Sequence, residues 1–159
     1  MNVQIIALGK LKEKYLTDAV KEYEKRISAF ARFSITELEP ERLPENPSES
    51  EISAALDAEA EKITARIPPN SMIIAMCIEG KQLSSEGFAK KINEAAINGK
   101  SSIAFIIGSS HGLSEKIKKT ASLRMSMSEM TFPHQLARVM LSEQIYRAFT
   151  IIHNRKYHK

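Results

Sequence analysis

The fold is decided between residues 72 and 108, where the chain reads MIIAMCIEGKQLSSEGFAKKINEAAINGKSSIAFIIG. Two short apolar runs rich in β-branched residues, 72–78 and 103–107, flank a helical stretch, 84–98, that ends at Gly99. Runs of this length and composition are typical of strands buried on both faces, as parallel strands are. A strand, a helix and a second parallel strand make one right-handed βαβ unit. This stretch therefore predicts an α/β fold.

The flanking sequence extends this unit into a single domain over residues 1–159. We expect further strands at 3–8, 33–38 and 123–127, and helices at 12–30, 49–66, 114–120 and 133–152. Ser48 and Glu51 form a capping box ahead of the second of these helices, and the proline-rich segment 39–47 before it is a loop. Apolar faces are expected at Tyr15, Ala19, Tyr23, Ile27 and Phe30 of the first helix, and at Ala137, Leu141, Ile145, Ala148, Phe149 and Ile152 of the last.

Composition excludes several classes of protein. The chain has 159 residues, 43% of them hydrophobic, and a formal net charge of +4. No apolar run is long enough for a membrane helix, and no leader precedes the first strand, so we expect a cytoplasmic protein. Cys77 alone forms no disulfide framework, and no Cys/His cluster has metal-ligand spacing. A basic tail, which contains no acid after Arg147, permits but does not establish binding to a polyanion.

Three loops are candidates for a ligand site, because ligands of open parallel sheets bind beyond the carboxyl ends of the strands. They are residues 78–82, 108–113 and 126–133. A dinucleotide fingerprint is absent, and a P-loop is excluded because Glu94 stands where its first glycine should be. By themselves, Gly108 and Gly112 favour a tight turn, and His111 a polar loop residue. Spacing alone likewise favours two exposed pairs, His134 with Arg138 and Glu143 with Arg147.

The order of the motifs is more specific than any one of them. The set comprises Gly9-Lys10, 22–26, Gly80-Lys81 with 84–87, 106–108 with Gly112-Leu113, 130–134, Arg138-Val139, 143–148 and 157–159. In this order the chain closely resembles, from end to end, the SPOUT-class large-subunit rRNA methyltransferase H family, whose members methylate N3 of a pseudouridine. One departure is visible: the family usually has a second glycine in a G-G-x-x-G pattern, where this chain has Ser109.

The resemblance implies a SPOUT-type fold, a mostly parallel sheet flanked by helices with a C-terminal trefoil knot over about residues 72–159. It also implies a homodimer that binds S-adenosylmethionine in the knot region and acts on 23S rRNA in the assembled ribosome, without a metal. By position, the family's cofactor contacts fall on Met76, Gly108, Met127, Ser128, Glu129, Met130, Thr131 and Phe132.

In such a reaction the base nitrogen attacks the sulfonium methyl after losing a proton to a general base. The candidates for the base are Glu143 and His158, since an imidazole exchanges protons near neutral pH. Tyr157 is expected to stack on the flipped base and Arg147 to stabilise its oxygens. RNA contacts are expected at His134, Arg138, Arg155 and Lys156. Two alternatives are a SPOUT enzyme acting on another RNA, such as a tRNA, and a non-catalytic ribosome-binding protein.

Overall fold

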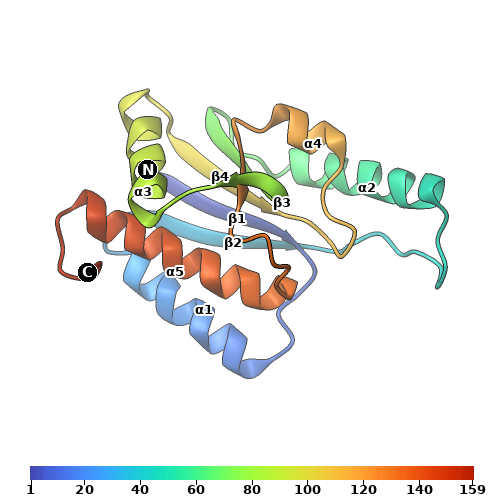
Figure 1. Ribbon diagram of the computed structural model, residues 1–159, viewed down its shortest axis with the longest axis horizontal. Helices are drawn as coiled ribbons and strands as arrows, with labels where there is room; N and C mark the ends of the chain where they lie inside the picture. Colours follow the sequence, from blue (N-terminus) through green and yellow to red (C-terminus); the bar gives the residue numbers. More distant parts are fainter.

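The computed structural model describes residues 1–159 as a five-stranded parallel sheet with helices on both faces (Figure 1). The strands are β1 (Asn2–Leu8), β2 (Arg32–Leu38), β3 (Ser71–Gln82), β4 (Ser102–Ile107) and β5 (Leu123–Ser126), in the spatial order β2-β1-β4-β3-β5. The helices are α1 (Lys14–Ile27), α2 (Glu49–Thr64), α3 (Ser85–Ile97), α4 (Glu115–Thr120) and α5 (His134–Ile152). The prediction of an α/β fold with a mostly parallel sheet is confirmed. The C-terminal trefoil knot stays a prediction.

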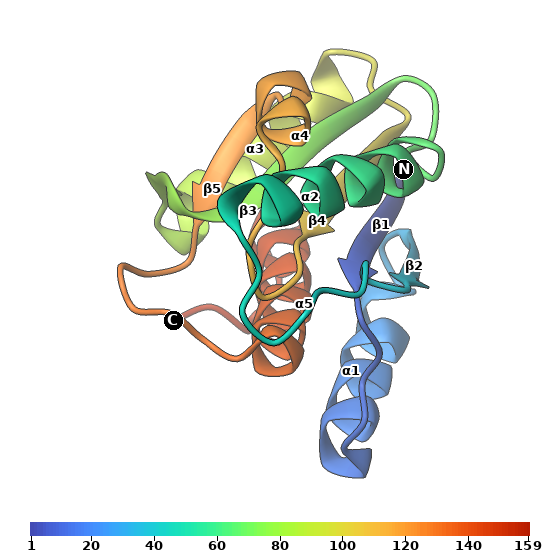
Figure 2. The ribbon, with the colours of Figure 1, turned by 90° about the vertical axis from the view of Figure 1, so that its right-hand side faces the viewer.

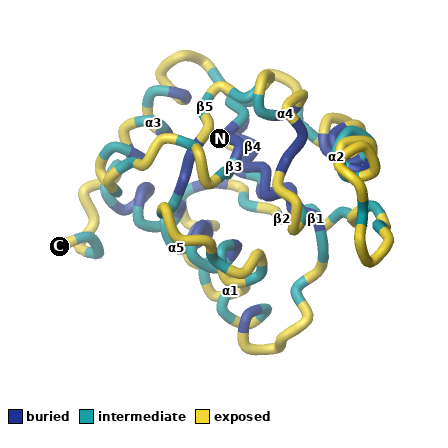
Figure 3. The backbone as a smooth tube through the Cα atoms, turned by 45° about the vertical axis from the view of Figure 1, so that its right-hand side comes forward, coloured by how far each residue is buried: buried dark blue, intermediate teal, exposed yellow.

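The strands divide their side chains between two apolar layers, because successive residues of a strand face opposite sides. Val3, Ile5 and Ala7 of β1 face the layer formed with α1, α3 and α5, and Ile6 and Leu8 face the layer formed with α2 and α4. Figures 1 and 2 show the two groups of helices on opposite sides of the sheet. All six residues of β4 are buried, and Figure 3 shows the deepest burial along these central strands. The continuous apolar run at 103–107 reflects this position.

Several local signals are confirmed. Ser48 Oγ accepts the backbone N–H of Glu51 at 3.2 Å and begins α2. In α5, Leu141, Ile145, Ala148 and Phe149 are buried against the sheet and neighbouring helices.

None of the helices has the length and apolar content needed to cross a membrane.

The apolar face of α1 differs from the expectation. Leu16, Val20 and Ile27 are buried, whereas Tyr15 is 71% exposed. Neighbouring residues of a helix point about 100° apart, so Tyr15 faces solvent when Leu16 faces the core. The expected pattern was wrong by one residue at the start of the helix, although Tyr23 and Phe30 do pack against the core.

Strand β3 also runs further than expected, through the segment 78–82 that was predicted as a loop. Met76 and Lys81 both pair with Met125 of β5, so the residues between them bulge out while the strand stays in the sheet. A Cβ on Gly80 would lie 2.6 Å from the backbone carbon of Met125. Only glycine allows the two strands to approach this closely. The bulge opens space at the carboxyl edge of the sheet.

Candidate active site

A cavity of about 400 Å³ opens beyond the carboxyl ends of β3, β4 and β5. The three neighbouring strands bring together the β3 bulge and the loops 108–113 and 126–133, as their parallel order predicts. Of the expected cofactor contacts, all but Glu129 line the cavity: Met76, Gly108, Met127, Ser128, Met130, Thr131 and Phe132. Half of the lining residues are hydrophobic, and the volume suits a small organic ligand.

Gly108 bounds this cavity through a very close backbone approach. A Cβ on Gly108 would lie 2.3 Å from the carbonyl oxygen of Gly112, and Gly112 itself has a φ of +85°. The N–H of Gly112 donates to the carbonyl of Ser109 at 2.9 Å. The interpretation of this segment as a tight turn is therefore confirmed. Ser109 has no positive φ, so serine fits the turn in the place of the second glycine.

The loop between β5 and α5 is held by its own serine side chains. Ser126 Oγ donates to the carbonyl of Ser128 at 2.8 Å, and Ser128 Oγ accepts the N–H of Met130 at 3.0 Å. Such local bonds replace the ladder bonds that a loop lacks. Met130 leaves 74% of its surface exposed. The loop therefore offers apolar side chains to a ligand.

One ion pair at the rim of the cavity joins Glu79 of the bulge to Lys118 of α4. The Lys118 Nζ and Glu79 Oε1 atoms are 2.5 Å apart, and only 15% of the lysine side chain is exposed. The hydrogen bond lowers the pKa of Glu79 and raises the pKa of Lys118. Residues 79 and 118 are far apart in sequence, so no spacing pattern indicates this pair. It ties α4 to the β3 bulge across the cavity.

Arg138 is not the exposed residue that its spacing from His134 favoured. Its side chain is 1% exposed, and it pairs with Glu37 of β2 at 2.6 Å and with the carbonyl of Gly9 at 3.1 Å. Burial lowers the pKa of Arg138, although the carboxylate partly opposes this shift. The expected pair with His134 was wrong, because a partner distant in sequence lies closer in the fold. In this position Arg138 has no surface for RNA.

The four candidate catalytic residues gather in one cluster along the C-terminal half of α5. Glu143 Oε1 accepts the Arg147 Nε–H at 3.0 Å and the Tyr157 hydroxyl at 3.1 Å, and the Arg147 guanidinium lies 4.8 Å from the Tyr157 ring centroid. His158 Nδ1 is 3.2 Å from Arg147 Nη1, and its Nε2 is 2.7 Å from Glu86 of α3. Burial and the bond to Glu143 raise the pKa of Tyr157 to about 12. The expected pair of Glu143 with Arg147 forms, but it is partly buried rather than exposed, since 17% and 25% of the two side chains are exposed.

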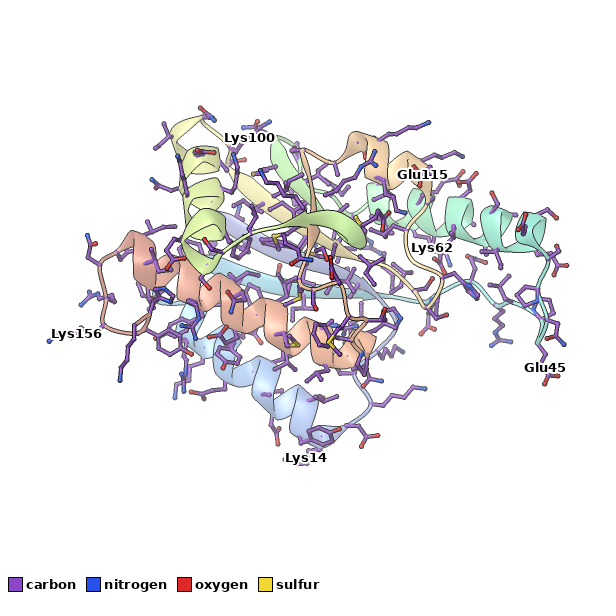
Figure 4. All side chains as sticks on the ribbon, viewed as in Figure 1. Lys14, Glu45, Lys62, Lys100, Glu115 and Lys156 are labelled. Carbon is purple, nitrogen blue, oxygen red and sulfur yellow. The ribbon has the colours of Figure 1, made fainter.

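The side chains of this cluster lie outside the 400 Å³ cavity of their own chain. None of its members lines that cavity, although Leu141, two residues before Glu143 on α5, does. Glu143 instead lines a separate cavity of about 470 Å³, which shares Met125, Ser126, Met127 and Leu141 with the first. In Figure 4 Lys156 lies at the end of the molecule opposite Glu45. Arg155 and Lys156 are both exposed, and His134 lies at the cavity rim.

The chain is similar over nearly its whole length to known proteins. Residues 1–158 match the family model described as "Predicted SPOUT methyltransferase". Proteins named "Ribosomal RNA large subunit methyltransferase H" are 52% identical in Streptococcus thermophilus and 49% identical in Leuconostoc mesenteroides, each over 159 residues and all of both chains.

Among solved structures, a probable methylase family protein from Haemophilus influenzae aligns with a TM-score of 0.53 over 99% of this chain and 70% of its own. At 15% identity this likeness concerns the fold alone. The chain belongs to the SPOUT methyltransferase family, among relatives named ribosomal RNA large subunit methyltransferase H.

Proposed function

We propose that the protein transfers a methyl group from S-adenosylmethionine to N3 of a pseudouridine in 23S rRNA. The observation that carries this proposal is the full-length similarity to relatives named ribosomal RNA large subunit methyltransferase H, which are 52% and 49% identical to this chain. We propose that the folded rRNA of the assembled ribosome, in the cytoplasm, supplies the recognition surface. The proposal includes a homodimer and a trefoil knot over about residues 72–159.

The cavity at the carboxyl edge fits the cofactor on two counts. At Gly108 the backbone comes as close to Gly112 as an absent Cβ allows, so the tight turn that lines the cavity keeps its shape only with glycine at this position. Met76, Met127 and Met130 supply polarisable apolar surface, while the serine-held loop leaves backbone donors and acceptors for an adenine edge and ribose hydroxyls. When bound, S-adenosylmethionine supplies a methyl group already activated by its sulfonium. The protein's part is to position donor and acceptor and to exclude water.

His158 is the proposed general base. A guanidinium has donors only, so the contact with Arg147 makes His158 Nδ1 the acceptor and puts the ring proton on Nε2, facing Glu86. In this tautomer the Nδ1 lone pair of His158 can take the N3 proton when the substrate displaces Arg147. Glu143 already accepts bonds from Arg147, Tyr157 and Gln144. Its proposed role is therefore to hold Arg147 and Tyr157 in place for contact with the base.

In the proposed homodimer the tail of one subunit meets the cavity of the other, so the tail and a cavity come together although they are separate within one chain. Co-expression of His158→Ala chains with Gly108→Val chains tests this arrangement. Mixed dimers then contain one site with both functional parts, so activity returns although each variant alone is inactive. If mixing restores no activity, the tail serves its own subunit.

The function itself is tested by mass mapping of rRNA from a deletion strain, with and without the restored gene. We expect one methyl to disappear from a pseudouridine of 23S rRNA and to return with the gene. Loss of a methyl from tRNA instead would establish the alternative substrate. A calorimetric titration separates the non-catalytic alternative: a protein that fails to bind S-adenosylmethionine at millimolar concentration is not this enzyme.

A further inference from the structure

Glu59 is a buried carboxylate for which the proposed chemistry has no use. It is 4% exposed on the inner face of α2, next to Ala55, Ala60 and Ile63, which are also buried. Removing a carboxylate from water is costly unless hydrogen bonds replace the lost hydration. A carboxylate in such a place is therefore expected to hold particular partners.

Each oxygen of Glu59 accepts one bond from a different loop. Oε1 accepts the backbone N–H of Glu41 at 2.9 Å, and Oε2 accepts the hydroxyl of Ser109 at 3.0 Å. Glu41 belongs to the proline-rich segment after β2, and Ser109 to the glycine turn after β4. Figure 2 shows α2 crossing above both segments. One side chain thus joins two loops that have no direct bond to each other.

These two loops are facing walls of a third cavity, of about 600 Å³. Its lining is mostly polar, and it contains Lys10, Lys12 and Glu59 itself. Ser109, Ser110, His111 and His134 line both this cavity and the cofactor cavity. Glu59 therefore acts at the boundary between the two cavities.

The turn that Glu59 holds leaves little room for movement. Ser109 directly follows Gly108, whose backbone already meets Gly112, and Ser109 accepts the N–H of Gly112. Any displacement of Ser109 toward the open third cavity therefore also moves Gly108 and Gly112 at the cofactor cavity. The hydrogen bond from the Ser109 hydroxyl to Glu59 is the only side-chain bond that restrains the turn from the α2 side.

We propose that Glu59 is a positioning residue, which fixes the turn 108–112 in its cofactor-binding shape through the Ser109 hydroxyl. Its second bond sets the distance between this turn and the segment after β2. The proposal rests on the proposed function, because it assigns the turn to S-adenosylmethionine. Glu59 itself does not line the cofactor cavity.

The test is a double-mutant cycle on the S-adenosylmethionine Kd, measured by calorimetry with the full-length protein. Glu59→Ala and Ser109→Ala are each expected to weaken binding about tenfold, the scale of one hydrogen bond to a charged group. The double variant should bind no more weakly than the worse single variant, because both changes remove the same restraint. Glu59→Gln should restore wild-type Kd, since its amide can accept from Glu41 and donate to Ser109.

Glu61→Ala is the matched control, because Glu61 lies exposed on the same helix and should leave Kd unchanged. A role confined to stability would lower the melting temperature of Glu59→Ala without altering the Kd of the folded protein, and that result overturns the proposal. Additive losses in the double variant also overturn it.

Hydrogen exchange in the free protein separates this inference from the proposed function. Amides of residues 108–113 should exchange faster in Glu59→Ala and in Ser109→Ala, but not in Glu61→Ala. If the wild-type protein fails to bind S-adenosylmethionine, the proposed function fails, while faster exchange still shows that Glu59 holds the turn. Unchanged exchange refutes the positioning role whatever the ligand.

Discussion

Replacing Arg138 by methionine should destabilise the protein more than any change to its other arginines. Arg138 is 1% exposed and donates to Glu37 and to the carbonyl of Gly9, so it fastens the start of α5 to the ends of β2 and β1. Removing one member of a buried ion pair costs about 3–5 kcal/mol. Because 32% of the Glu37 side chain is exposed, water can partly hydrate the abandoned carboxylate. We therefore expect Arg138→Met to lose stability at the low end of this range, about 3 kcal/mol.

The measurement is equilibrium unfolding in urea at a fixed protein concentration, followed by far-ultraviolet circular dichroism. A loss of about 3 kcal/mol should also lower the melting temperature by about 6–12 °C for a domain of this size. Arg66→Met is the control, because Arg66 is exposed and its replacement should cost less than about 0.5 kcal/mol.

A second variant tests the reason for this loss. The Nε of Arg138 is buried without a partner, so the guanidinium is not fully compensated in the native state. Replacing both charges, in Arg138→Met with Glu37→Leu, should recover most of the stability, since well-packed apolar pairs often replace buried ion pairs without loss. A loss below about 1 kcal/mol in Arg138→Met would refute the buried-pair argument. A double variant that is less stable to unfolding than both single variants would refute the expected recovery of stability.

Three further predictions concern the cavity and the tail. Gly108→Ala should abolish S-adenosylmethionine binding, because its Cβ would meet the carbonyl of Gly112, whereas Gly87→Ala on α3 should bind normally; calorimetry measures both. Saturation with the cofactor at about 100 times its Kd should add about 2.7 kcal/mol to the stability of the wild-type protein, and thermal unfolding with and without ligand checks this value. The pKa of Tyr157, raised to about 12, favours the neutral phenol in the folded state. The stability this provides is complete below pH 10 and is lost as the pH rises through about 12, so tail protection from carboxypeptidase should fall in that window and Tyr157→Phe should remove the dependence.

Much of the fold could be predicted from local signals. Apolar runs with β-branched residues mark the central strands, because such strands bury both faces. The bond of Ser48 to Glu51 is local, so its spacing in the sequence predicts the start of α2. The pairing of Glu143 with Arg147 could also be predicted from the sequence, since residues four apart share a helix face. The cavity could be placed because parallel strands all end at one edge of the sheet.

The remaining features depend on partners that are distant in sequence. The two members of the Arg138–Glu37 bond are 101 residues apart, and those of the Ser109–Glu59 bond are 50 apart. No periodicity connects such residues, and for Arg138 the local pattern indicated a different partner. The exposed position of Tyr15 and the length of β3 were also missed, because each depends on how one element packs against another.

The sequence by itself therefore determined the parallel α/β sheet, its cavity edge and the family, because these follow from short-range patterns and from the order of motifs. Only the tertiary structure decided that Arg138 is buried, that Glu59 holds the glycine turn, and that the tail cluster lies apart from its own cavity. The physical reason is that hydrogen bonds and burial depend on distance in space. Several of the segments that meet around these sites are separated along the chain by whole strands and helices.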